Sequence, residues 1–241
     1  MTMSRIVASE TLDHLAADDP VARRSRRDLV RVHRVMGTPS IVIRGWQALV
    51  SPERAKAPLK ILEIGAGDGT LLLGVARSLG PGWPQVQLTL LDRQDIVSPA
   101  TLACFSDLGW SAKVEVADAL EWATRPVAVA PRWDLVTTAL FLHHFEDKQL
   151  DTLLARIASS ANRFFACEPR RAWMALAGSH LVGALGANAV TREDAVLSVH
   201  AGFRASEITA LWPARGMDWQ CREFAAGLFS HCFSARRHGA D

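Results

Sequence analysis

The chain has 241 residues, a length typical of one α/β domain with room for a small cap. Hydrophobic residues make up 49% of it and charged residues 22%, so it can bury a sizeable core. The formal net charge of +2 argues against a dedicated nucleic-acid-binding protein. The first residues lack the apolar core of a secretion signal, and the four cysteines form no Cys-x-x-Cys pair. We therefore expect a cytoplasmic protein with neither a disulfide framework nor a zinc site.

The first 50 residues carry no strand signal, and we expect them to form a helical cap over the ligand-binding edge of a sheet. Helices are predicted at 21–36 and 41–50, followed by a polar linker at 51–58. The first helix is strongly basic, and one of its faces carries Arg23, Arg27, Arg31 and Arg34. This face is either a solvated surface or a surface that attracts an anionic substrate or carrier.

The most informative stretch, 62–70, contains Gly65, Gly67 and Gly69 in a Gly-x-Gly-x-Gly pattern. It follows an apolar run, Leu59–Ile64, that is predicted as a buried strand, and it precedes a predicted helix that ends near residue 80. A strand, a glycine-rich turn and a helix form the first unit of a doubly wound sheet. Because glycine has no Cβ, a ligand can lie against bare backbone beside the free N–H groups of the helix start.

The spacing of these glycines differs from the Gly-x-Gly-x-x-Gly pattern of dinucleotide-binding proteins. The turn is tighter, and Asp68 lies where it would repel a pyrophosphate. An uncharged ribose and a zwitterionic amino-acid tail fit this turn better than a diphosphate does.

Strands and helices alternate from residue 59 onward. Further strands are predicted at 87–91, 113–116, 133–139 and 163–167, and the helices between and after them at 98–109, 147–161, 191–200 and 206–211. Thr191 is the expected N-cap of the third of these helices. The runs 218–224 and 228–233, joined by 225–227, indicate a hairpin. We therefore predict five parallel strands plus a terminal hairpin.

Acidic residues end the second, third and fifth strands, where Asp92, Asp118 and Glu168 lie at the sheet edge at which ligands bind. Asp92 follows Gly69 at about the 20-residue distance at which an acid meets ribose hydroxyls. A carboxylate there accepts two hydroxyl hydrogen bonds and repels a 2′-phosphate, whereas the alternative is a surface turn acid. Asp118 either accepts from an adenine amino group or caps a short helix.

With these residues in place, the sequence over roughly 59–168 resembles the class I S-adenosylmethionine-dependent methyltransferases. The resemblance implies an α/β, Rossmann-like fold: a seven-stranded, mostly parallel sheet with an antiparallel terminal hairpin strand, a helical cap at 1–50 and a methyltransferase domain at 51–241. It also implies bound S-adenosyl-L-methionine, with its amino-acid end on the glycine turn, its ribose on Asp92 and its adenine near Asp118. The implied cofactor-binding residues are Glu63, Gly65, Ala66, Gly67, Gly69, Asp92, Arg93, Asp118, Ala119, Leu120 and Ala139.

The segment 142–147, Leu-His-His-Phe-Glu-Asp, is similar to the Leu-His-Asp-Trp-Ser-Asp stretch of plant-type phenolic O-methyltransferases, whose histidine is the general base. His143 matches that histidine, while His144 and Phe145 depart from the motif. We expect His143 to act as the base and His144 to orient it, because a neutral imidazole with a pKa near the working pH can take a phenol proton. The alternative is a loop histidine that only shapes the pocket. We expect no metal ion, since 143–146 offers its ligands too close together.

Residues 170–204 are the expected acceptor wall, an insertion in the methyltransferase domain. It is apolar with isolated polar groups, as suits an aromatic or acyl-substituted ring. The expected side chains are Trp173, Met174, Leu176, Leu181, Val182 and Leu185, with His180, Asn188 and His200. The C-terminal third resembles, more loosely, methyltransferases found with bacterial type III polyketide synthases. The uncharged stretch 172–191 is too polar for a membrane span.

The expected function is O-methylation of a small, aromatic or polyketide-derived acceptor. C- or N-methylation of a quinone-like or amine substrate and a non-catalytic partner subunit remain alternatives. A nicotinamide-dependent oxidoreductase would need the Gly-x-Gly-x-x-Gly pattern, which the chain lacks. Contact with a synthase or carrier through the basic helix from Arg23 to Arg34, and a homodimer, are also left open.

Overall fold

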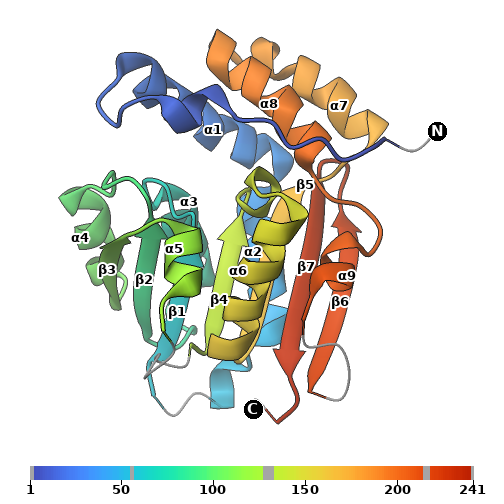
Figure 1. The fold of residues 1–241 in the computed structure, drawn as a ribbon. Coiled ribbons are helices and arrows are strands. Elements are labelled where there is room, and N and C mark those ends of the chain that lie inside the picture. The colour runs from blue at the N-terminus through green and yellow to red at the C-terminus, as the bar shows by residue number, and fades with distance from the viewer. Residues whose placement is uncertain (1–2, 55–56, 127–132, 214–217, 240–241) are drawn as a thin grey trace.

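A computed structural model describes residues 3–54, 57–126, 133–213 and 218–239 (Figure 1). Within these residues, seven strands form one sheet in the order β3-β2-β1-β4-β5-β7-β6. The first five strands of this order are parallel, and β7 runs antiparallel to both β5 and β6. The strands are β1 (Leu59–Ile64), β2 (Val86–Asp92), β3 (Trp110–Val116), β4 (Leu135–Ala139), β5 (Arg163–Pro169), β6 (Trp219–Ala226) and β7 (Ser230–Arg237). The predicted sheet and its terminal hairpin are confirmed.

Three of the differences from the predicted strand boundaries have a structural reason. β3 begins at Trp110 because it pairs with β2 along seven residues, and Trp110 is buried in the core. Trp133 makes only an isolated bridge, so β4 begins at Leu135. The hairpin turn lies at 227–229 and not at 225–227, because Gly227 supplies the positive φ of 70° that the turn uses.

Helices cover both faces of the sheet (Figure 1). One face carries α2 (Thr38–Leu49), α3 (Thr70–Leu79) and α4 (Pro99–Asp107), and the other carries α5 (Ala119–Thr124), α6 (Asp147–Ser160) and α9 (Glu207–Leu211). Each face has its own cluster of buried apolar side chains. Because both faces are covered, the strands are buried on two sides, and ligands can reach the sheet only at an edge.

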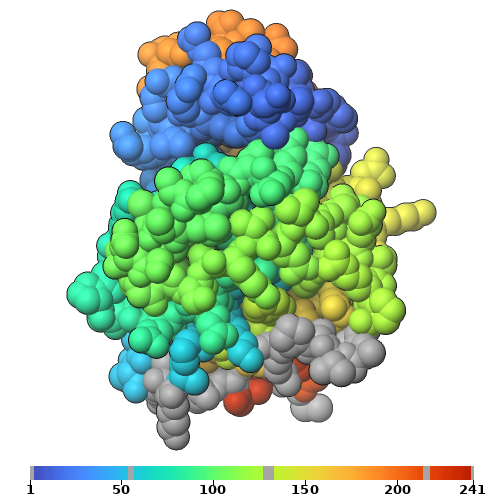
Figure 2. Space-filling model, turned by 90° about the vertical axis from the view of Figure 1, so that its left-hand side faces the viewer, coloured from blue at the N-terminus to red at the C-terminus, as the bar shows by residue number. Residues whose placement is uncertain are grey.

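A cap lies across the carboxyl edge of the parallel strands, as a layer on top of the sheet in Figures 1 and 2. It combines an N-terminal segment, residues 3–14, with α1 (Pro20–Met36), α7 (Trp173–His180) and α8 (Ala189–Ala201). The short 3-10 helices η1 (Thr11–His14) and η4 (Val182–Leu185) belong to the same layer, whereas η2 (Pro52–Arg54) precedes β1. Segments from both halves of the chain therefore build the cap together.

The expected cap at 1–50 has a different boundary in the structure, because α2 is part of the sheet domain. Its Ile41, Val42 and Trp46 are buried in the same cluster as side chains of α3 and the sheet. At Gly45 a Cβ would lie 2.2 Å from the ring of Phe165, so α2 packs directly on β5. The apolar side of α2 thus favours the sheet face, and the cap contributed by the N-terminus ends with α1.

A polar junction joins α1 to α8. The buried Asp28 of α1 accepts a hydrogen bond from the backbone N–H of Asn188, at 2.8 Å. The Asn188 side chain contacts Ser25 and accepts from the N–H of Thr191, also at 2.8 Å. Asn188 and not Thr191 is therefore the N-cap of α8, which corrects the predicted start of this helix.

Among the described residues, no helix combines the length and apolar character needed to cross a membrane. The cysteines Cys104, Cys167, Cys221 and Cys232 are free. Cys167 and Cys232 lie opposite each other on β5 and β7 and are fully buried.

Candidate functional site

A cavity of about 1140 Å³ lies between the carboxyl edge of the sheet and the cap. Its walls come from the ends of β1, β2 and β4, from the residue run after β3, and from the N-terminal segment, α1, η4 and α8. β1 and β4 are neighbours at the point where the strand order reverses, which is where open α/β sheets bind ligands. The volume exceeds the roughly 300–1,000 Å³ of a typical ligand pocket, so two ligands fit side by side.

Most of the predicted cofactor-binding residues line this cavity. Glu63, Gly65, Ala66, Gly67, Asp92, Arg93, Asp118, Ala119, Leu120 and Ala139 line its wall. Gly69 does not line it, which corrects its predicted ligand contact. It is the N-cap of α3 at a φ of 74°, where a Cβ would meet Leu90 and Thr101 at 3.4 Å. Gly69 therefore allows the backbone to take the positive φ that the turn before α3 needs.

Asp92 fixes the glycine turn to the end of β2. Its Oδ2 accepts a hydrogen bond from the N–H of Gly67 at 2.8 Å, and its Oδ1 accepts from the N–H of Gln94 at 2.9 Å. The N–H groups of Gly65 and Ala66 both donate to the carbonyl of Leu91. The carboxylate is thus held at the cavity wall with lone pairs left for a ligand.

Glu63 lies at the end of β1, buried beside this turn, with only 3% of its surface exposed. Its Oε2 has no hydrogen-bond partner among the described residues. Burial and the nearby charges of Asp92 and Asp68 raise the pKa of Glu63 well above its ordinary value. A cationic group held over the turn would give Oε2 a partner and offset the negative charges of the neighbouring acids. The glycine turn therefore suits a positively charged ligand.

Gly65 has a steric role that a substitution can test. Its φ is 76°, and a Cβ there would lie 2.1 Å from the ring of Phe141, which follows β4. We expect Gly65→Ala to lower the free energy of unfolding by about 1–3 kcal/mol and to weaken ligand binding at the turn. Urea unfolding measures the loss. Gly74→Ala is the matched control, because its Cβ meets no atom within 4 Å in α3; equal stability of the two variants would contradict the expectation.

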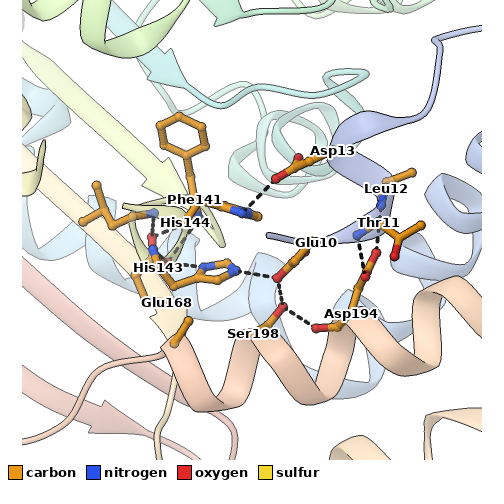
Figure 3. A network of polar contacts seen from close by, with 12 residues as sticks. Glu10, Thr11, Leu12, Asp13, Phe141, His143, His144, Glu168, Asp194 and Ser198 are labelled. Atoms are coloured by element: carbon orange, nitrogen blue, oxygen red, sulfur yellow. Dashed lines mark hydrogen bonds and ion pairs between the residues drawn. The ribbon is translucent and has the colours of Figure 1, made fainter. Parts of the chain in front are cut away.

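His143 also lines the cavity, from η3 (Leu142–His144), which follows β4. Its Nδ1 is 2.9 Å from Oε2 of Glu168, a fully buried carboxylate in β5 (Figure 3). Glu168 also accepts from the N–H groups of Phe141 and Leu142, at 3.1 and 3.0 Å. Leu140, before this turn, has a φ of 54°, which is rare without glycine and typical of functional sites.

Glu168, and not His144, therefore orients the imidazole of His143. The sequence places Glu168 among the strand ends at the ligand-binding edge but assigns it no role. The structure gives it one because β4 and β5 are neighbours, so their ends meet. His144 has a different contact, because its Nδ1 lies 3.1 Å from Asp13 of the N-terminal segment. The two histidine rings are neighbours, with centroids 4.2 Å apart, and both line the cavity.

Glu10, which the sequence did not single out, reaches the same histidine from the opposite side. Its Oε1 is 3.3 Å from Nε2 of His143 and also accepts from Oγ of Ser198 in α8 (Figure 3). Asp194 of α8 accepts from the N–H groups of Thr11 and Leu12, which holds this part of the chain. No local pattern could reveal the contact, because 133 positions separate Glu10 from His143.

These two carboxylates change the expected protonation of the proposed base. Burial lowers the pKa of His143, but the hydrogen bonds and charges of Glu10 and Glu168 outweigh burial and raise that pKa to about 9. We expected a neutral imidazole with a pKa near the working pH. The structure instead favours the imidazolium at neutral pH, because a carboxylate lies at each ring nitrogen.

Among the described residues, one group could share a metal ion: Glu10, His143 and His144. One ligand atom from each of these side chains lies within 4.8 Å of the other two. Contacts among these side chains, and with Ser198 and Asp13, account for this proximity. We therefore assign no ion to them, and a reaction without a metal remains a prediction.

Only some of the side chains expected in the acceptor wall line the cavity. Leu181, Val182 and Leu185 line it, whereas Trp173 and Met174 do not and are each 61% exposed. Leu176, His180, Asn188 and His200 also lie outside the lining. The small residues Ala175 and Gly178 of α7 face the cavity in their place.

His33 of α1 is a cavity residue to which the sequence had given no function. Burial lowers its pKa to about 4, although the charge of Asp68 in the glycine turn acts in the opposite direction. His33 is therefore neutral at physiological pH. Its only sequence signal was a place among the apolar residues of a basic helix.

No protein-family model and no curated protein matches this sequence. Solved structures resemble it. The plantazolicin methyltransferase BpumL, in complex with SAH, aligns with a TM-score of 0.60 and 16% identity over 92% of each chain. The magnesium protoporphyrin IX methyltransferase ChlM from Synechocystis PCC 6803, with bound SAH, aligns with a TM-score of 0.51 and 13% identity. The alignment covers 94% of this chain and 90% of ChlM. The mitomycin 7-O-methyltransferase MmcR aligns with a TM-score of 0.57 and 20% identity. The alignment covers 95% of this chain and 61% of MmcR. The chain thus has the class I methyltransferase fold.

Proposed function

We propose that the protein is an S-adenosyl-L-methionine-dependent methyltransferase that methylates a hydroxyl group of a small aromatic or polyketide-derived acceptor. One observation carries the proposal: a single cavity is lined both by the glycine turn with Asp92 and by His143, whose ring is held by Glu168. Proteins that share the fold are described as methyltransferases, and two of them hold SAH, the demethylated form of this cofactor.

The residues at the glycine turn fit the cofactor. Bound there, it supplies an electrophilic methyl group on a sulfonium. The bare backbone at Gly67, where a Cβ would meet no atom within 4 Å, leaves room for its amino-acid end. Glu63 is buried, and its Oε2 has no partner in the part of the chain that the structure describes, so it suits the positive charge. Asp92 would accept from the ribose hydroxyls. Asp118 caps α5 through Oδ1, at 2.8 Å from the N–H of Leu120, and its second oxygen is left for the adenine amino group.

His143 has the geometry of a general base. Glu168 holds Nδ1, so the tautomer and the ring orientation are fixed and Nε2 is the nitrogen directed into the cavity. When Nε2 is unprotonated, it can take the hydroxyl proton of the acceptor as the oxygen attacks the methyl carbon. Glu168 then stabilises the imidazolium that forms. The cap over the cavity orients the acceptor and excludes water.

Two further features of the structure concern the class of acceptor and its delivery to the cavity. An aromatic or polyketide-derived acceptor is supported by the apolar wall of Leu181, Val182 and Leu185 and by the likeness to mitomycin 7-O-methyltransferase. Delivery of the acceptor by an anionic synthase or carrier is supported by α1, which forms the roof of the cavity. The outward face of α1 carries five exposed arginines, Arg23, Arg24, Arg27, Arg31 and Arg34.

We expect calorimetry to show one S-adenosyl-L-methionine site per chain. Tritiated methyl groups should then pass to phenols or pyrones in a panel that also contains quinones and amines. Transfer to oxygen, located by mass spectrometry, supports the proposal. Binding with transfer only to carbon or nitrogen would replace its acceptor, and binding without transfer to any member would favour a non-catalytic partner subunit. The absence of binding would contradict the proposal as a whole.

A further inference from the structure

We propose that Glu10 is a positioning residue of this reaction, which the N-terminal segment carries into the site to hold Nε2 of His143 and to control the proton on that nitrogen. The inference rests on the proposed function, because it gives a role to a residue beside the proposed base. It adds a second carboxylate, from a part of the chain outside the sheet domain, to the orienting contact that Glu168 makes.

The Glu10 carboxylate is held by more than its contact with His143. Ser198 donates to the same Oε1, and only 12% of the Glu10 side chain is exposed. Asp194 fixes the residues that follow, Thr11 and Leu12, through their N–H groups. Together these contacts from α8 place Glu10 at the ring, so it is not a mobile surface acid that meets His143 by chance.

Arg5 anchors the start of the same segment to the catalytic turn. Its guanidinium donates to the carbonyl of Phe145 at 2.8 Å and to the carbonyl of Ala201 at 2.9 Å, and it pairs with Asp147 at 3.1 Å. The segment therefore joins the turn after β4 to the end of α8. Figure 3 shows Glu10 between His143 and Ser198, with its carboxylate directed at the His143 ring.

The acceptor oxygen has a place beside Glu10. With Oε1 and Nε2 3.3 Å apart, an oxygen on the cavity side can lie within the 2.7–3.0 Å of a hydrogen bond from both atoms. During transfer the acceptor O–H bond breaks and an N–H bond forms at Nε2. The oxygen electron pair forms the bond to the methyl carbon, and the bond from that carbon to sulfur breaks. The new N–H then faces Glu10, which stabilises it.

The groups that face His143 come from three parts of the chain: the N-terminal segment, the end of β5 and η3. Glu10 and Glu168 contact its two ring nitrogens, His144 lies beside its ring, and Asp13 pairs with His144. Arg5 lies 3.5 Å from the backbone carbonyl of His143. Both direct contacts of the ring are with carboxylates, so they dominate, and the pKa of His143 rises to about 9 despite burial. Turnover should therefore increase with pH up to this range.

Replacing Glu10 by glutamine removes one of these charges and keeps the shape of the side chain. In protein labelled with ¹³C-histidine, the His143 signal is identified by its absence in His143→Gln, and its titration is followed without acceptor. We expect a midpoint near pH 9 in the wild type and a midpoint lower by about 1 to 3 pH units in Glu10→Gln. The midpoint of the kcat–pH profile should shift in the same direction.

Glu193→Gln is the matched control, because Glu193 is exposed on α8. The His143 midpoint in this variant should equal that of the wild type. An unshifted midpoint in folded Glu10→Gln would overturn the inference. If Glu10→Gln does not fold, the wild-type titration still tests the inference, because a His143 midpoint at or below pH 7 would overturn it. Since the titration needs no transfer, a shifted midpoint without methylation would contradict the proposed function and not the placement of Glu10.

Discussion

Replacing His143 by glutamine is expected to lower kcat of methyl transfer by about 10²- to 10⁴-fold, with little change in the Kd of S-adenosyl-L-methionine. Glutamine retains a hydrogen-bonding group for Glu168 but cannot take a proton from the acceptor. His143 is not among the residues proposed to hold the cofactor, so we expect the cofactor to keep its contacts with the glycine turn and Asp92. Single-turnover transfer under saturating cofactor measures the rate, and calorimetry measures the Kd.

His238→Gln is the control for this variant, because His238 is exposed near the C-terminus and lies outside the cavity lining. His144→Gln separates the two neighbouring histidines. Since Asp13 and not His143 is the polar partner of His144, we expect its loss to affect kcat less than loss of His143 does. If His143→Gln turned over as fast as His238→Gln, the role of general base would be wrong, although the cofactor site would stand.

The parts of this molecule that could be predicted from sequence are those specified by nearby residues. The glycine turn was recognisable because a buried strand, three glycines and a helix follow one another within a few residues. Asp92 was recognisable because a strand end is a local feature, and parallel topology brings such ends to one edge. For the same reason, the cavity joins the residues after β1, β2, β3 and β4.

The parts that could not be predicted depend on long-range packing. Nothing around Glu10 marks it as a neighbour of His143, since the contact forms only when the N-terminal segment crosses the cap to α8. The protonation of His143 was mispredicted for that reason, because a pKa depends on which charges the fold brings near. Trp173 and Met174 show the same limit: apolar character alone did not tell which side of α7 faces the cavity.

Replacing Asp92 by alanine is expected to raise the Kd of S-adenosyl-L-methionine by at least about 100-fold. Hydrogen bonds to a charged group contribute roughly 1.5–3 kcal/mol each, and two ribose hydroxyls would lose such a bond. The N–H groups of Gly67 and Gln94 would lose their acceptor too. Asp95→Ala is the matched control, because Asp95 is exposed in the same loop and does not line the cavity. Equal affinity of the two variants would contradict the assignment of Asp92.

A weaker Kd alone would not show how Asp92 acts, because its loss also frees the glycine turn. An S-adenosylhomocysteine analogue that lacks both ribose hydroxyls separates the two effects. If Asp92 binds the hydroxyls, the wild type discriminates strongly against this analogue, and Asp92→Ala binds both ligands almost equally. If Asp92 only supports the turn, the substitution weakens both ligands by the same factor and discrimination persists. This comparison of two proteins with two ligands tests the contact itself. The two backbone hydrogen bonds of Asp92 are absent from the variant whichever ligand is bound, so their loss cancels.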